Sequence, residues 1–422
     1  MRVLTSASGT SWYDEALSEM VLEQVNFSWE KHWYCVMGGS QEIAKRMGAL
    51  VQKKGAGRIQ FGKKVTKIER LFTTSQKQGN GHWVLPELAV EVAGEPRARV
   101  YNAIFNSAPL GNMQRMDLRG LNLNWGTKQA IRSLGYGASC KIGIRFKQIW
   151  WKQMTQPINK GGSSKTDQPI RNCVYPSYNK DDPDDQSGVL LASYTWSQEA
   201  QRIGTLIADK SPEGEAELKA LLVDNLARLH SETQDEYDSI KKTIEATYDT
   251  HFAYDWYTDK GTTGAFAYFG PGQFRNMYPY IIRNDGTHII IGEAASAHHA
   301  WVVGALESAV RGVYQFLCHH SKHDAKLNEV FQAYNDDKIR SPYGPVPAEF
   351  DRTTGVLPLG VDNQKQPTGA SPIGEWLRQG VLAEEIRLEQ GGDRLDPAKV
   401  VAEQVADFIL SKKPSAESEL KT

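Results

Sequence analysis

The sequence has few cysteines and no excess of either charge. Its four cysteines, Cys35, Cys140, Cys173 and Cys318, are dispersed along 422 residues without a C-x-x-C pair, which argues against a zinc site and against a disulfide framework. Lys and Arg total 49 against 50 Asp and Glu, so charge favours neither nucleic acid nor an anionic membrane as a partner. We therefore expect no metal, no nucleic acid and no membrane.

Long apolar runs are also missing. No stretch approaches the roughly 18 residues that cross a bilayer, and the opening MRVLTSASGTSWYDEAL lacks the apolar core of a signal peptide. A cytoplasmic location is the default expectation, although the compartment stays unknown. No Ser-His-Asp spacing, metal triad or Walker loop is present, which removes those enzyme classes.

The strongest pattern present is a strand, a turn and a helix near the middle of the second half. THIII (residues 287–291) suits a buried strand, and small residues recur along one face of the following helix, up to Gly312. Such a smooth helix can approach a sheet or a cofactor closely. Glu293 could bind sugar hydroxyls and Trp301 could lie against a flat ring, beside N–H groups that favour electron-rich ligands. An ordinary buried strand and helix would fit the same residues.

Other helices are expected at the start of the chain and in its centre. Residues 11–25 place apolar side chains at helical spacing with acids on the other side. A second helix follows Ser40, with Ile43, Met47 and Leu50 inward. The clearest helix has Ser211 as N-cap and Pro212 as its first residue.

Strands and loops fill most of the remainder. We expect a polar surface loop over residues 155–187, an Asp285-Gly286 hairpin, and an irregular aromatic loop over 264–274. The further elements expected are strands at 59–71, 83–92, 100–110, 141–151 and 188–196, a short helix at 128–134, and helices at 374–390 and 396–411 before a disordered end.

Four segments in this order, GGS, KVTKIE, NSAPL and GEAASAHHAW, resemble the flavin amine oxidase family, and in particular its fungal L-amino-acid oxidases. The resemblance covers about residues 10–345. It implies an α/β fold in which an FAD-binding domain of the glutathione-reductase-like type is interleaved with an α+β substrate-binding domain. It also implies noncovalent FAD, because the cysteine that attaches flavin in the monoamine oxidase branch has no counterpart here.

The resemblance assigns roles to particular residues. Lys141 would be the catalytic lysine, which reaches flavin N5 through a water. The substrate would be bound by Tyr194 through its carboxylate, by the ring of Phe266, by the backbone oxygen of Ala300 and by Trp301. FAD would be bound by Val65, Trp256, Glu293, Trp301, Val302 and Ala305.

The sequence departs from the family at its start. The strand, G-x-G-x-x-G turn and helix that bind pyrophosphate are absent, as is the arginine that clamps the substrate carboxylate. We therefore expect an N-terminally truncated form without the first βαβ unit. The expected domains are a remnant of the helical substrate region (1–30), a discontinuous FAD-binding domain (31–135 and 282–320), a substrate-binding domain (136–281) and a C-terminal helical extension (321–422).

Three functions remain open from the sequence. The first is FAD-dependent oxidation of L-amino acids by O2 to 2-oxo acids, ammonia and hydrogen peroxide. The second is a non-catalytic remnant that acts as an interaction module, and the third is an amine or polyamine oxidase. The substrate's side chain is not predicted, and a homodimer is left open.

Overall fold

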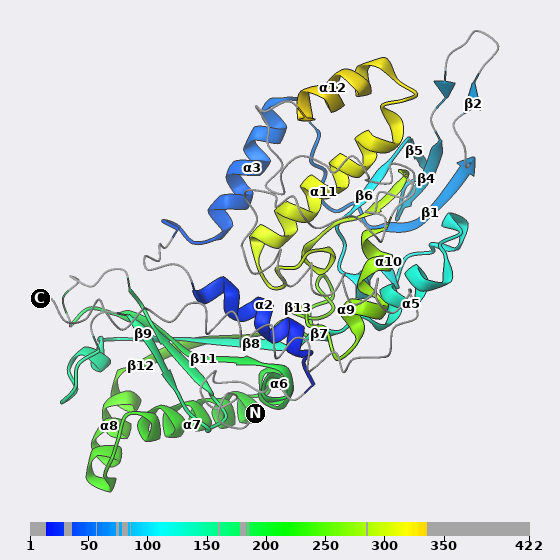
Figure 1. Ribbon diagram of the computed structural model, residues 1–422. Coiled ribbons are helices and arrows are strands. Elements are labelled where there is room, and N and C mark those ends of the chain that lie inside the picture. Colours follow the sequence, from blue (N-terminus) through cyan, green and yellow to red (C-terminus); the bar gives the residue numbers. More distant parts are fainter. Residues whose placement is uncertain are drawn as a thin grey trace, which may run out of the picture.

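The protein has two lobes with a short helix between them. The structure, a computed structural model, describes residues 14–28, 36–55, 57–72, 76–77, 83–84, 86–158, 161–177, 183, 185–283 and 286–335. Figure 1 shows the helix α2 (Leu17–Ser28) lying between the lobes. The two lobes meet where α2 begins, and the candidate site lies there.

A five-stranded antiparallel sheet, ordered β12-β8-β11-β10-β9, forms the base of the first lobe. Alternate residues of β8 (Ser139–Phe146), which lies between β12 and β11, are fully buried in one core: Cys140, Ile142, Ile144 and Phe146. Because side chains alternate along a strand, Lys141 lies on the opposite, open face. The strands are β8 (Ser139–Phe146), β9 (Gly162–Lys165), β10 (Asn172–Tyr175), β11 (Gly188–Trp196) and β12 (Tyr248–Asp255).

Three helices cover the buried face of this sheet (Figure 1). The longest begins as the sequence predicts: Ser211 accepts a hydrogen bond from the Gly214 N–H, and Pro212 is the first helical residue. Its leucines at four-residue spacing enter the core that lies beneath the sheet. The helices are α6 (Ser197–Ala208), α7 (Pro212–Leu229) and α8 (Gln234–Thr247).

The second lobe contains the strand and helix that dominate the sequence pattern. Strand β14 (His288–Ile290) pairs in parallel with β6 (Ile104–Asn106), and helix α11 (Val302–His320) packs on β14. A Cβ atom on Gly312 would lie 2.7 Å from the Ile291 Cγ2 atom. The expected close approach of helix and strand is therefore confirmed at Gly312.

The other elements lie mainly in the second lobe, except η2, whose Trp150 and Trp151 belong to the core of the first. The segment at 266–267 forms a short strand, β13, which pairs with β7 and contacts the turn before α11. These elements are α3 (Gln41–Lys53), β1 (Val65–Phe72), β2 (Gln76–Lys77), β3 (Trp83–Val84), β4 (Glu87–Val92), β5 (Arg99–Tyr101), α4 (Leu110–Met113), η1 (Arg119–Leu121), α5 (Trp125–Ser133), β7 (Tyr136–Gly137), η2 (Trp150–Lys152), β13 (Phe266–Ala267), α9 (Gln273–Asn276), α10 (Tyr278–Ile282), η3 (Glu293–Ala295) and α12 (Ala325–Asn335).

Three local predictions are wrong. The polar segment 155–187 contains β9 and β10, because strand pairing at the sheet edge outweighs its polar composition. The apolar face of α3 is exposed rather than inward: Ile43, Met47 and Leu50 are 37, 46 and 65 % exposed. No hairpin surrounds Gly286, since α10 precedes it and β14 pairs in parallel with the distant β6.

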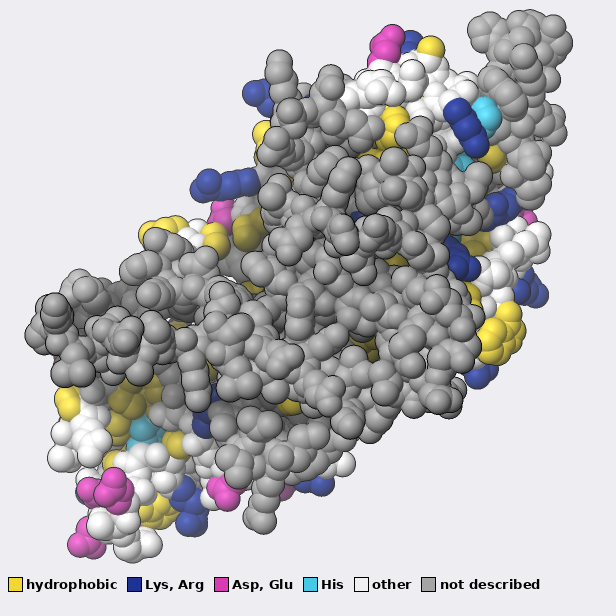
Figure 2. Space-filling view, in the orientation of Figure 1, with side chains coloured by type: hydrophobic (Ala, Val, Ile, Leu, Met, Phe, Trp, Pro, Cys, Tyr) yellow, Lys and Arg dark blue, Asp and Glu magenta, His cyan; other side chains and the backbone are white. Residues whose placement is uncertain are grey.

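Some predictions fall outside what the structure tests. The helices expected at 374–390 and 396–411 lie outside the described residues, and the domain limits remain a prediction. Within the described residues, no helix combines the length and apolarity needed to cross a membrane. On the face shown in Figure 2, the described Lys and Arg side chains lie in separate small groups.

Replacing Gly312 with alanine tests the contact between α11 and β14. Alanine normally stabilises a helix interior by about 0.5–1 kcal/mol relative to glycine, but here its Cβ would overlap Ile291. We expect Gly312→Ala to destabilise by about 1–3 kcal/mol, measured as a fall in the thermal unfolding midpoint. The control is Gly48→Ala in α3, where the nearest atom would be 3.6 Å away; its midpoint should not fall. An unchanged or raised midpoint for Gly312→Ala would contradict the contact.

Candidate active site

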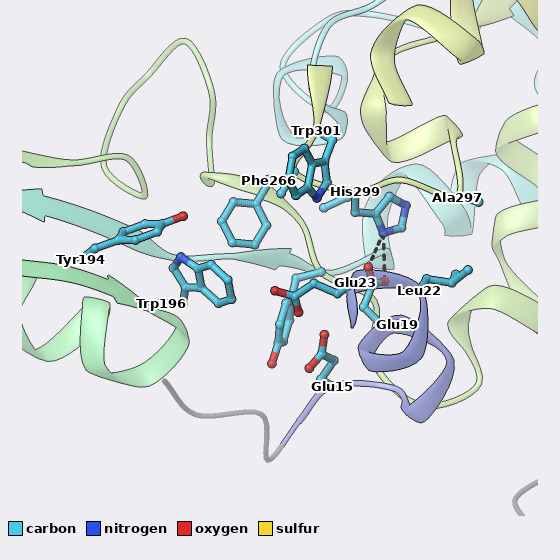
Figure 3. A pocket seen from close by; sticks show the side chains of 13 residues that line it. Glu15, Glu19, Leu22, Glu23, Tyr194, Trp196, Phe266, Ala297, His299 and Trp301 are labelled. Atoms are coloured by element: carbon cyan, nitrogen blue, oxygen red, sulfur yellow. Dashed lines mark hydrogen bonds and ion pairs between the residues drawn. The ribbon is translucent and has the colours of Figure 1, made fainter. Parts of the chain in front are cut away.

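A cavity of about 240 Å³ lies between the end of the five-stranded sheet and the turn before α11 (Figure 3). It brings together the four residues predicted to bind substrate: Tyr194 from β11, Phe266 from β13, and Ala300 with Trp301 from the turn. The other described lining residues are Glu15, Glu19, Leu22, Glu23, Trp196, Ala267, Tyr268, Ala297 and His299.

Aromatic rings form one wall of the cavity. The rings of Tyr194 and Trp196 lie edge to face with centroids 5.4 Å apart, and Trp196 meets Phe266 in the same way at 5.8 Å. Burial raises the pKa of Tyr194 to about 12. Tyr194 therefore keeps its proton at neutral pH, and its hydroxyl can donate a hydrogen bond to an anionic group.

Lys141 stands beside this wall but does not line the cavity. It pairs in register with Tyr194 across β8 and β11, and its Nζ lies 4.7 Å from the centre of the Tyr194 ring. The side chain is solvent-accessible along the open face of the sheet, yet enough protein surrounds it that desolvation lowers its pKa. A lysine in this setting can exchange a proton more readily than a fully solvated one.

The turn before α11 is fixed by Glu293. One carboxylate oxygen of Glu293 accepts a hydrogen bond from the Ala267 N–H at 2.8 Å, and the other accepts from the Ala300 N–H at 3.3 Å. Ala300 has φ 65°, a left-handed conformation that is strained for a residue with a Cβ. The hydrogen bond from its N–H helps to hold this conformation and so directs the Ala300 backbone at the cavity.

Three glutamates of the α2 segment face the cavity, which reverses the expectation for this helix. Glu15 and Glu19 are only 7 and 5 % exposed, whereas Leu17 between them is 44 % exposed. Glu19 and Glu23 are four residues apart in α2 and share one helix face, and Glu15 lies just before the helix, four residues from Glu19. The i, i+4, i+8 spacing was visible in the sequence, but acids are normally placed toward solvent, and nothing local showed that a cavity lies on that side.

Glu19 is held by His299. The His299 Nδ1 lies 2.8 and 2.9 Å from the two Glu19 oxygens, and Glu19 also accepts the Phe269 N–H at 3.1 Å. Burial alone would lower the pKa of His299, but the hydrogen bond to Glu19 and the charges of Glu19 and Glu293 together raise it. The raised pKa favours the protonated form of His299, and its contact with Glu19 anchors α2, a role that the sequence did not reveal.

Among the described residues, no cation pairs with Glu15 or Glu23. Burial, followed by repulsion from Glu23, Glu19 and Asp14, raises the pKa of Glu15 to about 9. Burial and the charge of Glu19 raise the pKa of Glu23 to about 7. Glu15 is therefore mainly protonated near pH 7, and Glu23 is partly so.

The remaining predicted residues lie outside this cavity. Trp256 follows β12, with its ring 4.7 Å from that of Tyr254. Val302 and Ala305 are in the first turn of α11, where Val302 is 54 % exposed. Val65 begins β1 and lines a separate cavity of about 510 Å³.

The sequence pattern of a known family matches most of the chain. The family, described as flavin containing amine oxidoreductase, matches residues 2–315. The chain belongs to this family. The expected membership is thereby confirmed, and FAD is confirmed as the family's cofactor. Its noncovalent attachment remains a prediction.

Two relatives align with about three quarters of this chain. L-amino-acid oxidase 4 of Hebeloma cylindrosporum is 36% identical over 343 residues, which cover 78% of this chain and 51% of that protein. A Dictyostelium discoideum protein provisionally named a bifunctional amine oxidase is 37% identical over 318 residues, covering 74% and 28%. The chain spans about half or less of the length of these relatives.

A solved structure shares the fold. Cyclohexylamine oxidase from Brevibacterium oxydans superimposes with a TM-score of 0.51 at 14% identity, over 78% of this chain and 63% of that one. The chain therefore has the α/β fold of the flavin-containing amine oxidoreductases, as the sequence predicts. The incomplete first βαβ unit remains a prediction.

The raised pKa of Glu15 predicts how the stability of the folded protein depends on pH. Between pH 4.5 and about 9 the folded protein keeps a proton on Glu15 that the unfolded chain releases, so stability falls as pH rises through this window. Glu15→Gln removes that loss. We expect the variant's unfolding midpoint, minus the parent's, to increase from pH 5 to pH 9. Glu217→Gln on the exposed side of α7 is the control and should show a constant difference. A constant difference for Glu15→Gln would contradict the buried, protonated carboxyl.

Proposed function

We propose that this protein takes part in FAD-dependent oxidative deamination of L-amino acids, giving 2-oxo acids, ammonia and hydrogen peroxide. The observation that carries the proposal is the cavity that gathers Tyr194, Phe266, Ala300 and Trp301 from three separate segments. Its aromatic wall suits an apolar substrate stem, and polar side chains, among them Tyr194 and three glutamates, face the same space. The likeness to L-amino-acid oxidase 4 supports the same substrate class.

The cavity offers separate groups for the two ends of an amino acid. The protonated hydroxyl of Tyr194 can donate to the substrate carboxylate, and a hydrogen bond to a charged group contributes about 1.5–3 kcal/mol. The backbone oxygen of Ala300 can accept from the amino group. Glu293 would then act through Ala300, since it holds that residue's N–H.

Several observations fit FAD beside this cavity. Trp301 and the exposed Val302 and Val303 present an apolar surface at the start of α11, where the helix N-terminus favours electron-rich atoms. Gly304 lets the turn close over the helix, because a Cβ there would lie 2.1 Å from the His298 oxygen. Val65 and its separate cavity would hold the adenine end. When bound, FAD supplies the electron-accepting ring and returns the electrons to O2.

Lys141 is proposed to hold a water and move a proton next to the reacting face. Its ammonium group has three donors, and Tyr194 limits its position through the ring contact at 4.7 Å. Its lowered pKa reduces the cost of giving up a proton. Lys141 and Tyr194 would thus act on different parts of the reaction from adjacent strands.

Amine oxidation is the second candidate. The described cavity lining contains Glu15, Glu19 and Glu23 but neither Lys nor Arg, which suits a cationic amine better than an anionic carboxylate. The fold shared with cyclohexylamine oxidase is compatible with this substrate class.

The first test measures cofactor and turnover together. The full chain, purified and mixed with FAD, should show flavin absorption bands and form peroxide with L-amino acids. Lys141→Met should slow peroxide formation by roughly 10²-fold or more, the usual scale for a positioned acid–base group. Lys147→Met, just beyond the same strand and exposed, is the control. A colourless, inactive parent would favour the non-catalytic alternative, and an unchanged Lys141→Met rate would exclude the role of Lys141.

Tyr194→Phe separates amino acids from amines. Loss of the hydroxyl should raise the KM for L-amino acids about tenfold or more, from a charged hydrogen bond, while kcat changes little. Turnover of an amine with the same side chain should be unaffected because it has no carboxylate. Equal effects on both substrates, or on neither, would refute carboxylate binding by Tyr194.

A further inference from the structure

The carboxylates of the α2 segment are placed as a binding group rather than as a solvated helix face. Figure 3 shows Glu19 and Glu23 on α2, and Glu15 just before it, on the same side of the cavity near Trp196, Phe266 and His299. Repulsion among the three carboxylates is strong enough to contribute to the raised pKa values of Glu15 and Glu23. Such an arrangement costs stability unless a positive group is bound there.

The three carboxylates are not equally satisfied. Glu19 contacts His299 and the Phe269 N–H. Glu15 is only 7 % exposed, and its Oε2 atom has no hydrogen-bond partner among the described residues. Buried polar atoms are rarely left unpaired. An unpaired carboxyl oxygen at the wall of a cavity therefore points to a ligand that donates to it.

The chemistry of that ligand follows from the surroundings. The only charged basic group among the described lining residues is His299, which already pairs with Glu19. The rings of Trp196 and Phe266 border the same space and can stabilise a cation through their faces. A cation with several N–H donors satisfies every one of these features, whereas an anion satisfies none.

We propose that Glu15 and Glu23 bind a second positive charge of the substrate, remote from the amine that is oxidised. The substrate class is therefore amino acids with a cationic side chain, such as L-lysine. This inference rests on the proposed function, since it specifies the substrate of the same cavity.

Binding of this cation should depend on pH. Glu15 and Glu23 must be ionised to bind it well, and their raised pKa values place that ionisation near pH 7 for Glu23 and near pH 9 for Glu15. Affinity should thus rise between pH 7 and pH 9. The titratable or charged groups that face them are Asp14, Glu19, Tyr194, Tyr268, Glu293 and His299, from α2, β11, the 266–269 segment and the turn before α11.

Four ligands distinguish the effect of the remote cation on binding from the effect of the α-carboxylate. L-lysine and L-norleucine differ by the side-chain ammonium, and 1,5-diaminopentane and pentylamine repeat that difference without an α-carboxylate. Binding to the full chain is measured by isothermal titration calorimetry at pH 7 and pH 9, with peroxide formation measured in parallel. We expect L-lysine to bind about tenfold or more tightly than L-norleucine at pH 9, the scale of one charged hydrogen bond.

Two variants test whether Glu15 and Glu23 cause the preference for L-lysine. Glu15→Gln and Glu23→Gln keep the shape and remove the charge, and either should reduce the lysine preference, while Glu217→Gln should not. Glu23 is partly exposed, so its variant folds even if Glu15→Gln does not. A lysine preference of threefold or more that either variant reduces supports the inference. A smaller preference, a preference that neither variant reduces, or no binding of any of the four ligands overturns it.

The same experiment separates this inference from the proposed function. Equal peroxide formation from L-lysine and L-norleucine would support amino-acid oxidation and refute a binding site for the remote cation. A lysine preference in binding without peroxide would support the cation site and count against oxidation by this chain.

Discussion

The contact between His299 and Glu19 is the interaction on which the site depends. It joins α2, at one end of the chain, to the turn before α11, almost three hundred residues later. Glu19 also accepts the Phe269 N–H, and the Ala16 N–H donates to the Phe269 oxygen at 2.9 Å. Three segments thus meet at one buried ion pair: α2, the segment at Phe269 and the turn before α11. Removing one partner of a buried pair leaves an uncompensated charge and costs about 3–5 kcal/mol, so loss of either side chain should disturb all three segments.

The contact between His299 and Glu19 positions the other site residues. His299 and Ala300 are neighbours, so fixing the imidazole also fixes the strained backbone of Ala300. Glu293 then ties Ala300 to Ala267, next to Phe266. The cavity wall is consequently a network of backbone hydrogen bonds held by the carboxylates of the buried Glu19 and the half-buried Glu293. The groups left to meet a ligand are the Tyr194 hydroxyl, the aromatic faces, Glu15 and Glu23.

Much of this arrangement could be read from the sequence, and the part that could not has a physical cause. The Ser211-Pro212 helix start and the strand 188–196 carry local signals, and the structure has both. The family pattern correctly gave the fold and FAD, and it chose four residues that share a cavity. It could not show that α2 turns its glutamates inward, because that orientation is set by His299, 280 positions away. The exposed apolar face of α3 was missed for the same reason, since periodicity gives a helix face but not its neighbour.

The glutamates of α2 also make folding a proton-uptake reaction. Near pH 7 the unfolded chain carries Glu15 ionised, while the folded chain holds a proton there. Each folding event therefore draws protons from the buffer. The heat measured on unfolding will consequently include the heat of buffer ionisation, and it will differ between buffers of the same pH.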